Sequence, residues 1–169
     1  SDLNFKQLRG NKMNTWRLFQ PISFQVIWLA CVLGGNEWLF IPGLILVAHF
    51  ILTPSFKNDL QILPLIFLGC ALDVFFTQIG LFVFDVFPFW LMMLWVAFVL
   101  NFGHSLGFLR RVKLPWLMIV GAIGGSYAYW ISWQLGAVTW PYGPILSTSV
   151  IAITWSILLP ILVRGDLYF

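Results

Sequence analysis

Long apolar runs separated by short polar stretches make up most of the chain. An α-helix needs about 20 apolar residues to cross the hydrocarbon core of a bilayer, and roughly 17 to 25 are tolerated. Six runs meet this requirement, at residues 18–34, 38–54, 62–84, 89–109, 114–133 and 144–163. The connections between them contain the glycine, proline and asparagine residues typical of turns. The pattern predicts an all-α fold, a polytopic transmembrane bundle of six helices.

Composition supports a membrane location. Of the 169 residues, 60% are apolar or aromatic and only 9% are charged, and the mean hydropathy is +0.91. A water-soluble domain of this size could not remain dispersed with so little charge. The composition therefore indicates an integral membrane protein with membrane lipids as its surroundings.

The basic residues predict the orientation of the bundle. When the N-terminus is placed in the cytoplasm, all nine lysine and arginine residues lie on the cytoplasmic side, and Glu37 and Asp85 lie on the other. This distribution follows the positive-inside rule. We expect both termini in the cytoplasm and a multi-pass location in the bacterial inner membrane. Residues 1–12 are interpreted as a polar leader or a remnant added for expression, before a single transmembrane domain over residues 13–169.

The sequence lacks the residues that several kinds of binding and catalysis require. The bases flank apolar runs and form no patch with exposed aromatic residues, so no nucleic-acid partner is expected. Cys31 and Cys70 lie in apolar runs without metal-ligand spacing. The sequence contains no phosphate-binding loop, zinc-protease motif or serine-hydrolase elbow. We expect no cofactor and no metal.

An acidic residue, Asp73, lies at the centre of the third predicted span. Gly69, Asp73, Phe76, Thr77 and Gly80 share one face of that helix. Small residues on this face allow close helix packing, so the carboxylate is expected to point into the bundle near the bilayer midplane. An ionisable residue inside a membrane is by default a candidate functional group. The alternative is a neutral or hydrogen-bonded aspartate that only fixes helix packing.

Other polar residues fall at membrane depth on other predicted helices. His49 lies in the second span, Gln25 in the first, and Asn101 and His104 in the fourth. We expect these side chains to form a polar cluster with Asp73 that binds a substrate, proton or ion. For each histidine the alternative is a neutral ring satisfied by a backbone carbonyl. In the fifth span, Gly121 and Gly125 have the GxxxG spacing of a helix-packing face.

Three segments resemble a known family. They are "GCALDVFFTQIGLFVF", "FWLMMLWVAFVLNFGHSLGFL" and "GAIGGSYAYWISWQLGAV". Together they are similar to small bacterial inner-membrane proteins classed as a domain of unknown function. The Gly69-x-x-x-Asp73 span in a six-helix chain is also similar to the rod-shape-determining family of the MreD type. In architecture it is similar to substrate-binding subunits of energy-coupling-factor transporters.

Two classes of function follow from these residues. In the first, an intramembrane polar pocket binds or processes a lipophilic substrate, such as a lipid, fatty acyl or isoprenoid group, with Asp73, His49 and His104 as polar anchors. In the second, the protein is a non-catalytic scaffold or transporter subunit with a membrane-protein partner. The sequence leaves open whether the protein is an enzyme.

Overall fold

The computed structural model describes the backbone of residues 2–165 and the side chains of Trp16 and residues 18–165. Within this part the regular elements are helical, apart from one isolated β-bridge between Val83 and Thr139. The elements are α1 (Asp2–Gly34), η1 (Gly35–Trp38), α2 (Phe40–Leu52), α3 (Phe56–Ile62), α4 (Leu65–Gln78), α5 (Phe89–Gly103), η2 (Gly107–Arg111), α6 (Leu114–Gln134) and α7 (Gly143–Gly165). The prediction of an all-α fold is confirmed. The side chains of residues 1–12 and of Arg17, which entered the orientation argument, lie outside the described part.

Four helical segments in the described part are long and apolar enough to cross a membrane. They cover Leu18–Trp38, Phe56–Gln78, Leu114–Gln134 and Gly143–Gly165. Helices α2 and α5 are also apolar but have only 13 and 15 residues. Large apolar side chains point outward, with exposed fractions of 77% for Phe67 and 84% for Ile145. Such surfaces are compatible with an integral membrane protein whose outer faces contact lipid.

The third span differs from the prediction at both ends. It begins at Phe56 and ends at Gln78, whereas residues 62–84 were expected. Pro64 divides it into α3 and α4, because a proline has no backbone N–H to continue the helical hydrogen bonds. After α4 the chain turns at Gly80, which has a φ of 75°. Gly80, expected on the packing face of a helix, therefore serves the turn instead. Asp73 lies five residues before the last residue of α4, not at the middle of a span.

The second and fourth spans are shorter than expected. Helix α2 ends at Leu52 because Pro54 follows closely. Helix α5 ends at Gly103, and residues 104–109, expected in the same helix, form a turn and the start of η2. Because the helices end early, His49 lies in the last turn of α2, and His104 is the residue that caps the C-terminal end of α5.

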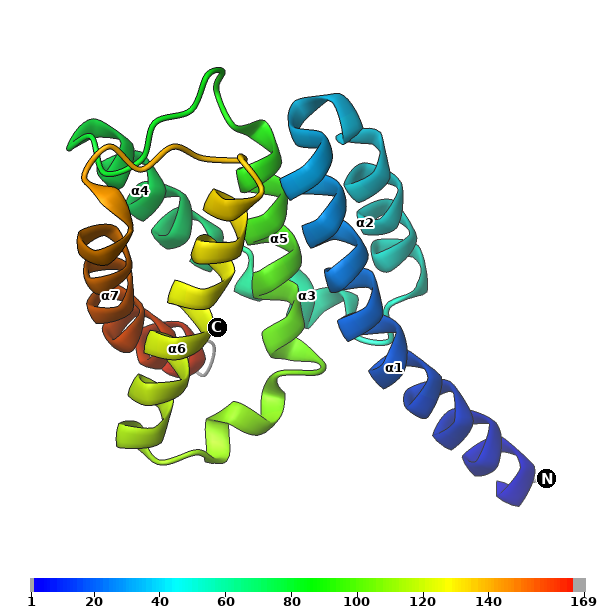
Figure 1. Cartoon of the computed structure of the whole chain (residues 1–169). Coiled ribbons are helices and arrows are strands. Elements are labelled where there is room, and N and C mark those ends of the chain that lie inside the picture. The colour runs from blue at the N-terminus through cyan, green and yellow to red at the C-terminus, as the bar shows by residue number, and fades with distance from the viewer. Residues whose placement is uncertain (1, 166–169) are drawn as a thin grey trace.

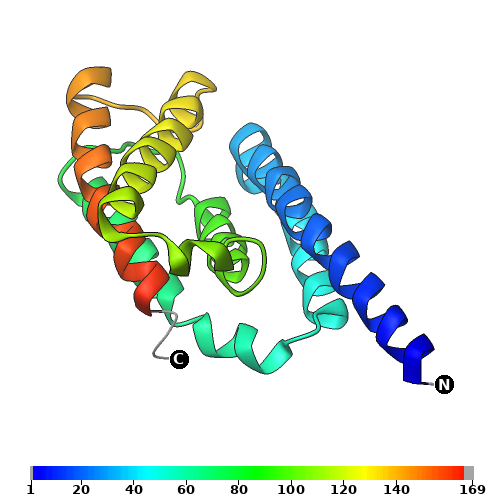
Figure 2. The same cartoon turned by 90° about the horizontal axis from the view of Figure 1, so that it is seen from below.

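Two pairs of helices flank α5, one pair on each side (Figure 1). Helices α1 and α2 pack together, and α6 packs mainly against α7. Helix α5 contacts α1 and α4, and in Figure 2 it lies between the α1 and α2 pair on one side and the α6 and α7 pair on the other. The N-terminal part of α1 extends beyond the bundle (Figure 2).

Candidate functional site

A groove of about 510 Å³ runs between α1, α5 and α6. Helix α5 contributes its floor, and α1 and α6 form its two sides. The lining is mostly aromatic and aliphatic, and the main contributors are Phe24, Gln25 and Trp28 from α1, Trp90, Leu94, Trp95 and Phe98 from α5, Gly124, Ala128 and Tyr129 from α6, and Trp155 from α7. Its volume falls within the range of about 300–1,000 Å³ that is usual for ligand sites.

The groove opens sideways, between α1 and α6. Among its lining residues, Val120 and Tyr127 on α6 are 45% and 66% exposed. Gln25 on α1 is also exposed. Figure 2 shows α1 and α6 separated across α5. The opening therefore lies between helices whose exposed side chains are largely apolar.

The buried carboxylate of Asp73 holds two residues of the groove wall. The indole Nε1 of Trp95 donates to Asp73 Oδ2 over 2.5 Å, and the hydroxyl of Tyr129 donates to Asp73 Oδ1 over 2.7 Å. Both aromatic rings line the groove, whereas Asp73 lies behind them. Asp73 therefore fixes the shape of the wall through α5 and α6 and does not itself reach the groove.

The Gly69-x-x-x-Asp73 spacing has a direct structural explanation. Gly69 lies one helical turn before Asp73 on α4, and a Cβ at Gly69 would lie 2.2 Å from the indole ring of Trp95. The missing side chain thus provides the slot in which Trp95 reaches Asp73. Trp95 in turn stacks on Trp155 of α7, with ring centroids 5.6 Å apart.

The glycines of α6 bring α7 close. A Cβ at Gly121 would lie 2.2 Å from the carbonyl oxygen of Trp155, and one at Gly125 would lie 2.1 Å from the Trp155 ring. Gly124, one position earlier than Gly125, faces open space beside the groove. Two glycines therefore set the α6–α7 contact, and a third leaves the groove wide.

A second polar cluster joins α2, α3 and α5. The Nε2 atoms of His49 and His104 lie 3.2 Å and 2.9 Å from the two carboxylate oxygens of Asp59. Thr53 Oγ1 also donates to Asp59, whose residue is 0% exposed. The cluster thus satisfies a fully buried carboxylate with three donors. Asp59, expected in a connecting loop, is the residue that brings the two histidines together.

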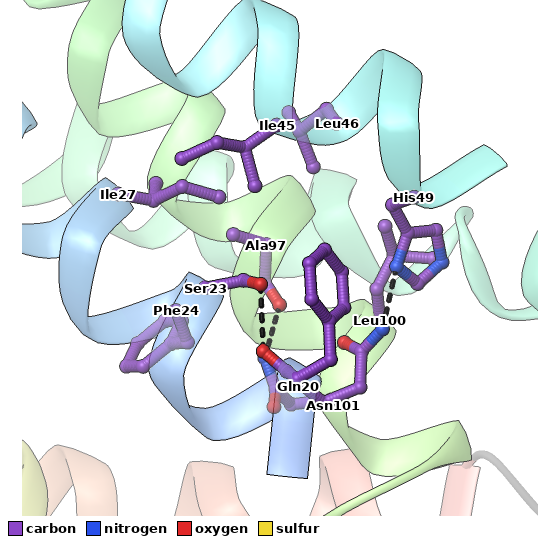
Figure 3. Close-up of a pocket in the computed structure, with 11 residues that line it drawn as sticks. Gln20, Ser23, Phe24, Ile27, Ile45, Leu46, His49, Ala97, Leu100 and Asn101 are labelled. Carbon is purple, nitrogen blue, oxygen red and sulfur yellow. Dashed lines mark hydrogen bonds between the residues drawn. The ribbon is translucent and has the colours of Figure 1, made fainter. Parts of the chain in front are cut away.

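The hydrogen bonds at Nδ1 of His104 and His49 show which nitrogen of each ring carries the proton. Trp16 Nε1 donates to His104 Nδ1 over 3.0 Å, and an indole can only donate. His104 therefore carries its proton on Nε2, directed at Asp59. The Gln20 amide nitrogen lies 2.8 Å from His49 Nδ1, which gives His49 the same arrangement (Figure 3). Neither ring keeps a free nitrogen for acid–base chemistry.

The hydrogen bonds of this cluster also bear on whether its residues could bind a metal ion. His49, Asp59 and His104 offer ligand atoms within 4.8 Å of one another, and two histidines with a carboxylate are a common donor set. A ligating histidine, however, usually donates from its other ring nitrogen to a carboxylate or carbonyl. His104 instead accepts from Trp16 at that nitrogen. The donor set therefore fits a hydrogen-bonded cluster better than a metal ion.

The structure places the predicted polar residues in separate groups. His49 and His104 meet at Asp59, but Asp73 bonds to Trp95 and Tyr129 on other helices. Their physical separation follows from the early ends of α2 and α5 and from the position of Asp73 near the end of α4.

Asn101 and Gln25 are not among the hydrogen-bond partners of Asp59 or Asp73 in the described structure. Asn101 donates to the carbonyl of Ala97 and accepts from the Ser105 hydroxyl, so it shapes the end of α5 next to His104. Asn101 also lines a void of about 10 Å³ with Gln20 and His49, drawn in Figure 3. That volume is about the size of one water site. Gln25 lines the large groove instead.

A known protein family matches most of the chain. The family described as "Protein of unknown function (DUF2878)" matches residues 17–161. No curated protein and no solved structure matches. The weaker resemblances to the MreD type and to transporter subunits remain expectations. The match covers most of the chain and all six expected spans except the last residues of the sixth, so the chain belongs to the DUF2878 family of proteins of unknown function.

Proposed function

We propose that the protein binds the hydrocarbon chain of a membrane lipid in the groove between α1, α5 and α6. The observation that carries the proposal is a groove of about 510 Å³ with aromatic walls and an opening between the apolar outer faces of α1 and α6. Lipophilic ligands bind in concave, predominantly apolar and aromatic sites with few polar groups. The protein resides in the bacterial inner membrane under this proposal, with its basic side toward the cytoplasm.

The length of the groove suits an extended chain. Its lining on α6 runs from Val120 to Ser132, which at about 1.5 Å per residue is about 18 Å. One leaflet of the hydrocarbon core is about 15 Å deep. A single acyl or isoprenoid chain that enters from one membrane surface and spans one leaflet can therefore follow most of the groove.

The walls are held in place before a ligand arrives. Asp73 fixes Trp95 and Tyr129, and Tyr129 also stacks on Phe82 with ring centroids 5.3 Å apart. A preformed site avoids the entropic cost of ordering side chains on binding. We assign Asp73 the role of positioning the wall. We assign His49, Asp59 and His104 the role of joining α2, α3 and α5.

Filling the groove tests the proposal. In Gly124→Leu the new side chain occupies groove space without a backbone clash, because a Cβ at Gly124 has nothing within 4 Å. We expect this variant to lose most of the lipid that remains with the purified wild type in mild detergent. Lipid per protein is measured by mass spectrometry.

Gly43→Leu is the matched control. Gly43 lies in α2, its Cβ would also have nothing within 4 Å, and it does not line the groove. The control should keep wild-type lipid. Equal lipid in Gly124→Leu and the wild type would contradict chain binding. If the wild type instead carries a stoichiometric partner helix that Gly124→Leu loses, the scaffold alternative takes its place.

A further inference from the structure

The two ends of the groove carry opposite charges. At one end, Leu106 and Leu109 line the groove from the segment that joins α5 to α6. Arg110, Arg111 and Lys113 follow in the same segment, and all three are exposed. Arg110 also donates to the carbonyl of Phe102. Figure 1 shows this segment at the opposite end of α5 from the α4–α5 loop.

The other end carries acidic residues. Phe84 and Trp90 line the groove there, and the exposed Asp85 directly follows Phe84. The exposed Glu37 lies next to Asn36, whose side chain bonds to the backbone of Phe87 and Trp90 at the start of α5. An anionic group at this end would meet charges of its own sign.

We infer that the lipid bound in the groove has a net negative phosphate headgroup, seated against Arg111 and Lys113. This inference rests on the proposed binding of a hydrocarbon chain. A chain that lies along Leu106 and Leu109 leaves its headgroup at the bases that follow them in the sequence. An arginine guanidinium binds phosphate oxygens in a bidentate geometry, and lysine adds a point charge. The acids at the far end oppose the reversed orientation.

The positive-inside rule alone would also place bases on this side, so the test needs a control from the same side. Lys57 and Arg164 are exposed bases that do not adjoin the groove. Removing these two charges changes the net charge by the same amount as removing Arg111 and Lys113. A difference between the two double variants therefore reports on position and not on total charge.

The experiment measures quenching of tryptophan fluorescence by lipids with brominated chains. Trp28, Trp90, Trp95 and Trp155 line the groove, and the part of the quenching that Gly124→Leu abolishes is specific to it. We expect brominated phosphatidylglycerol to bind roughly tenfold more tightly than brominated phosphatidylcholine or diacylglycerol. The pair Arg111→Gln and Lys113→Gln should remove this preference, and the pair Lys57→Gln and Arg164→Gln should keep it.

The outcomes separate the two proposals. Equal groove-specific quenching by all three lipids, or an equal effect of the two double variants, would overturn the headgroup assignment and leave chain binding intact. Absence of groove-specific quenching by every lipid would overturn chain binding itself.

Discussion

Replacing Asp59 by leucine is expected to destabilise the protein in detergent by about 2–5 kcal/mol. Leucine has a similar size and favours helix, but it offers no acceptor to His49, His104 and Thr53. Interhelical polar contacts in membrane proteins average about 0.6 kcal/mol, so three of them contribute about 2 kcal/mol, and a buried polar group left without a partner costs about 1–3 kcal/mol more. The first figure and the sum of the two set the range expected when a cluster of three donors loses its acceptor. The midpoint of unfolding in a mixed detergent with increasing denaturing surfactant measures the change.

Two further variants show whether the loss of stability comes from the lost hydrogen bonds of Asp59. Asp85→Leu removes an exposed acid and should leave the midpoint almost unchanged. Asp59→Asn should lie between the leucine variant and the wild type. Asparagine retains one acceptor oxygen, and Gln20 can turn its amide so that His49 reverses its donor and acceptor nitrogens. A leucine variant as stable as the wild type would show that the cluster does not join α2, α3 and α5.

Gly121→Ala is expected to destabilise the protein by about 2 kcal/mol, although alanine is the better helix former by about 1 kcal/mol. The added Cβ would lie 2.2 Å from the carbonyl oxygen of Trp155 and 2.9 Å from the Cβ of Leu159. Because one of these atoms belongs to the backbone, relief requires α6 and α7 to move apart. The same unfolding midpoint measures the effect.

Gly124→Ala is the control for this substitution. It lies on the same helix three residues away, where a Cβ meets nothing within 4 Å. It should equal or slightly exceed the wild type in stability because only the helix propensity changes. A Gly121→Ala variant that behaves like Gly124→Ala would mean that α6 and α7 are less closely packed than described.

The fold class followed from hydrophobicity because apolar runs of membrane length have few alternative structures. Some ends of the helices were harder to predict, since single prolines decide them. Pro54 and Pro64 shortened α2 and divided the third span. The helix that contains Asp59 was interpreted as a loop because polar residues surround it in the sequence.

A helical pattern in the sequence could have identified Asp59. The buried positions of α3 and α4 are Asp59, Ile62, Leu65, Gly69, Asp73 and Phe76. They recur every three or four residues, so the buried face of the third span continues upstream into the segment assigned to the loop. An acid on that face, near a histidine ten residues earlier, is a plausible hydrogen-bond partner.

The partners of Asp73 could not be predicted in this way. Trp95 and Tyr129 are 22 and 56 residues away in the sequence. Gly69 and Asp73 were recognised as one face, but the ring that fills the gap above Gly69 depends on how α4 packs against α5. The groove likewise arises from the spacing of α1 and α6 around α5, which helical periodicity does not specify.

The most direct test of chain binding is an experimental structure of the wild-type protein determined in lipid. We expect continuous, elongated density along the groove, in contact with Trp95 and Tyr129 and ending beside Arg111. Gly124→Leu, determined in the same lipid, should lack this density while α6 and α7 stay in place. A wild-type structure in which α1 and α6 close the groove, or in which a helix of another protein fills it, would contradict lipid-chain binding.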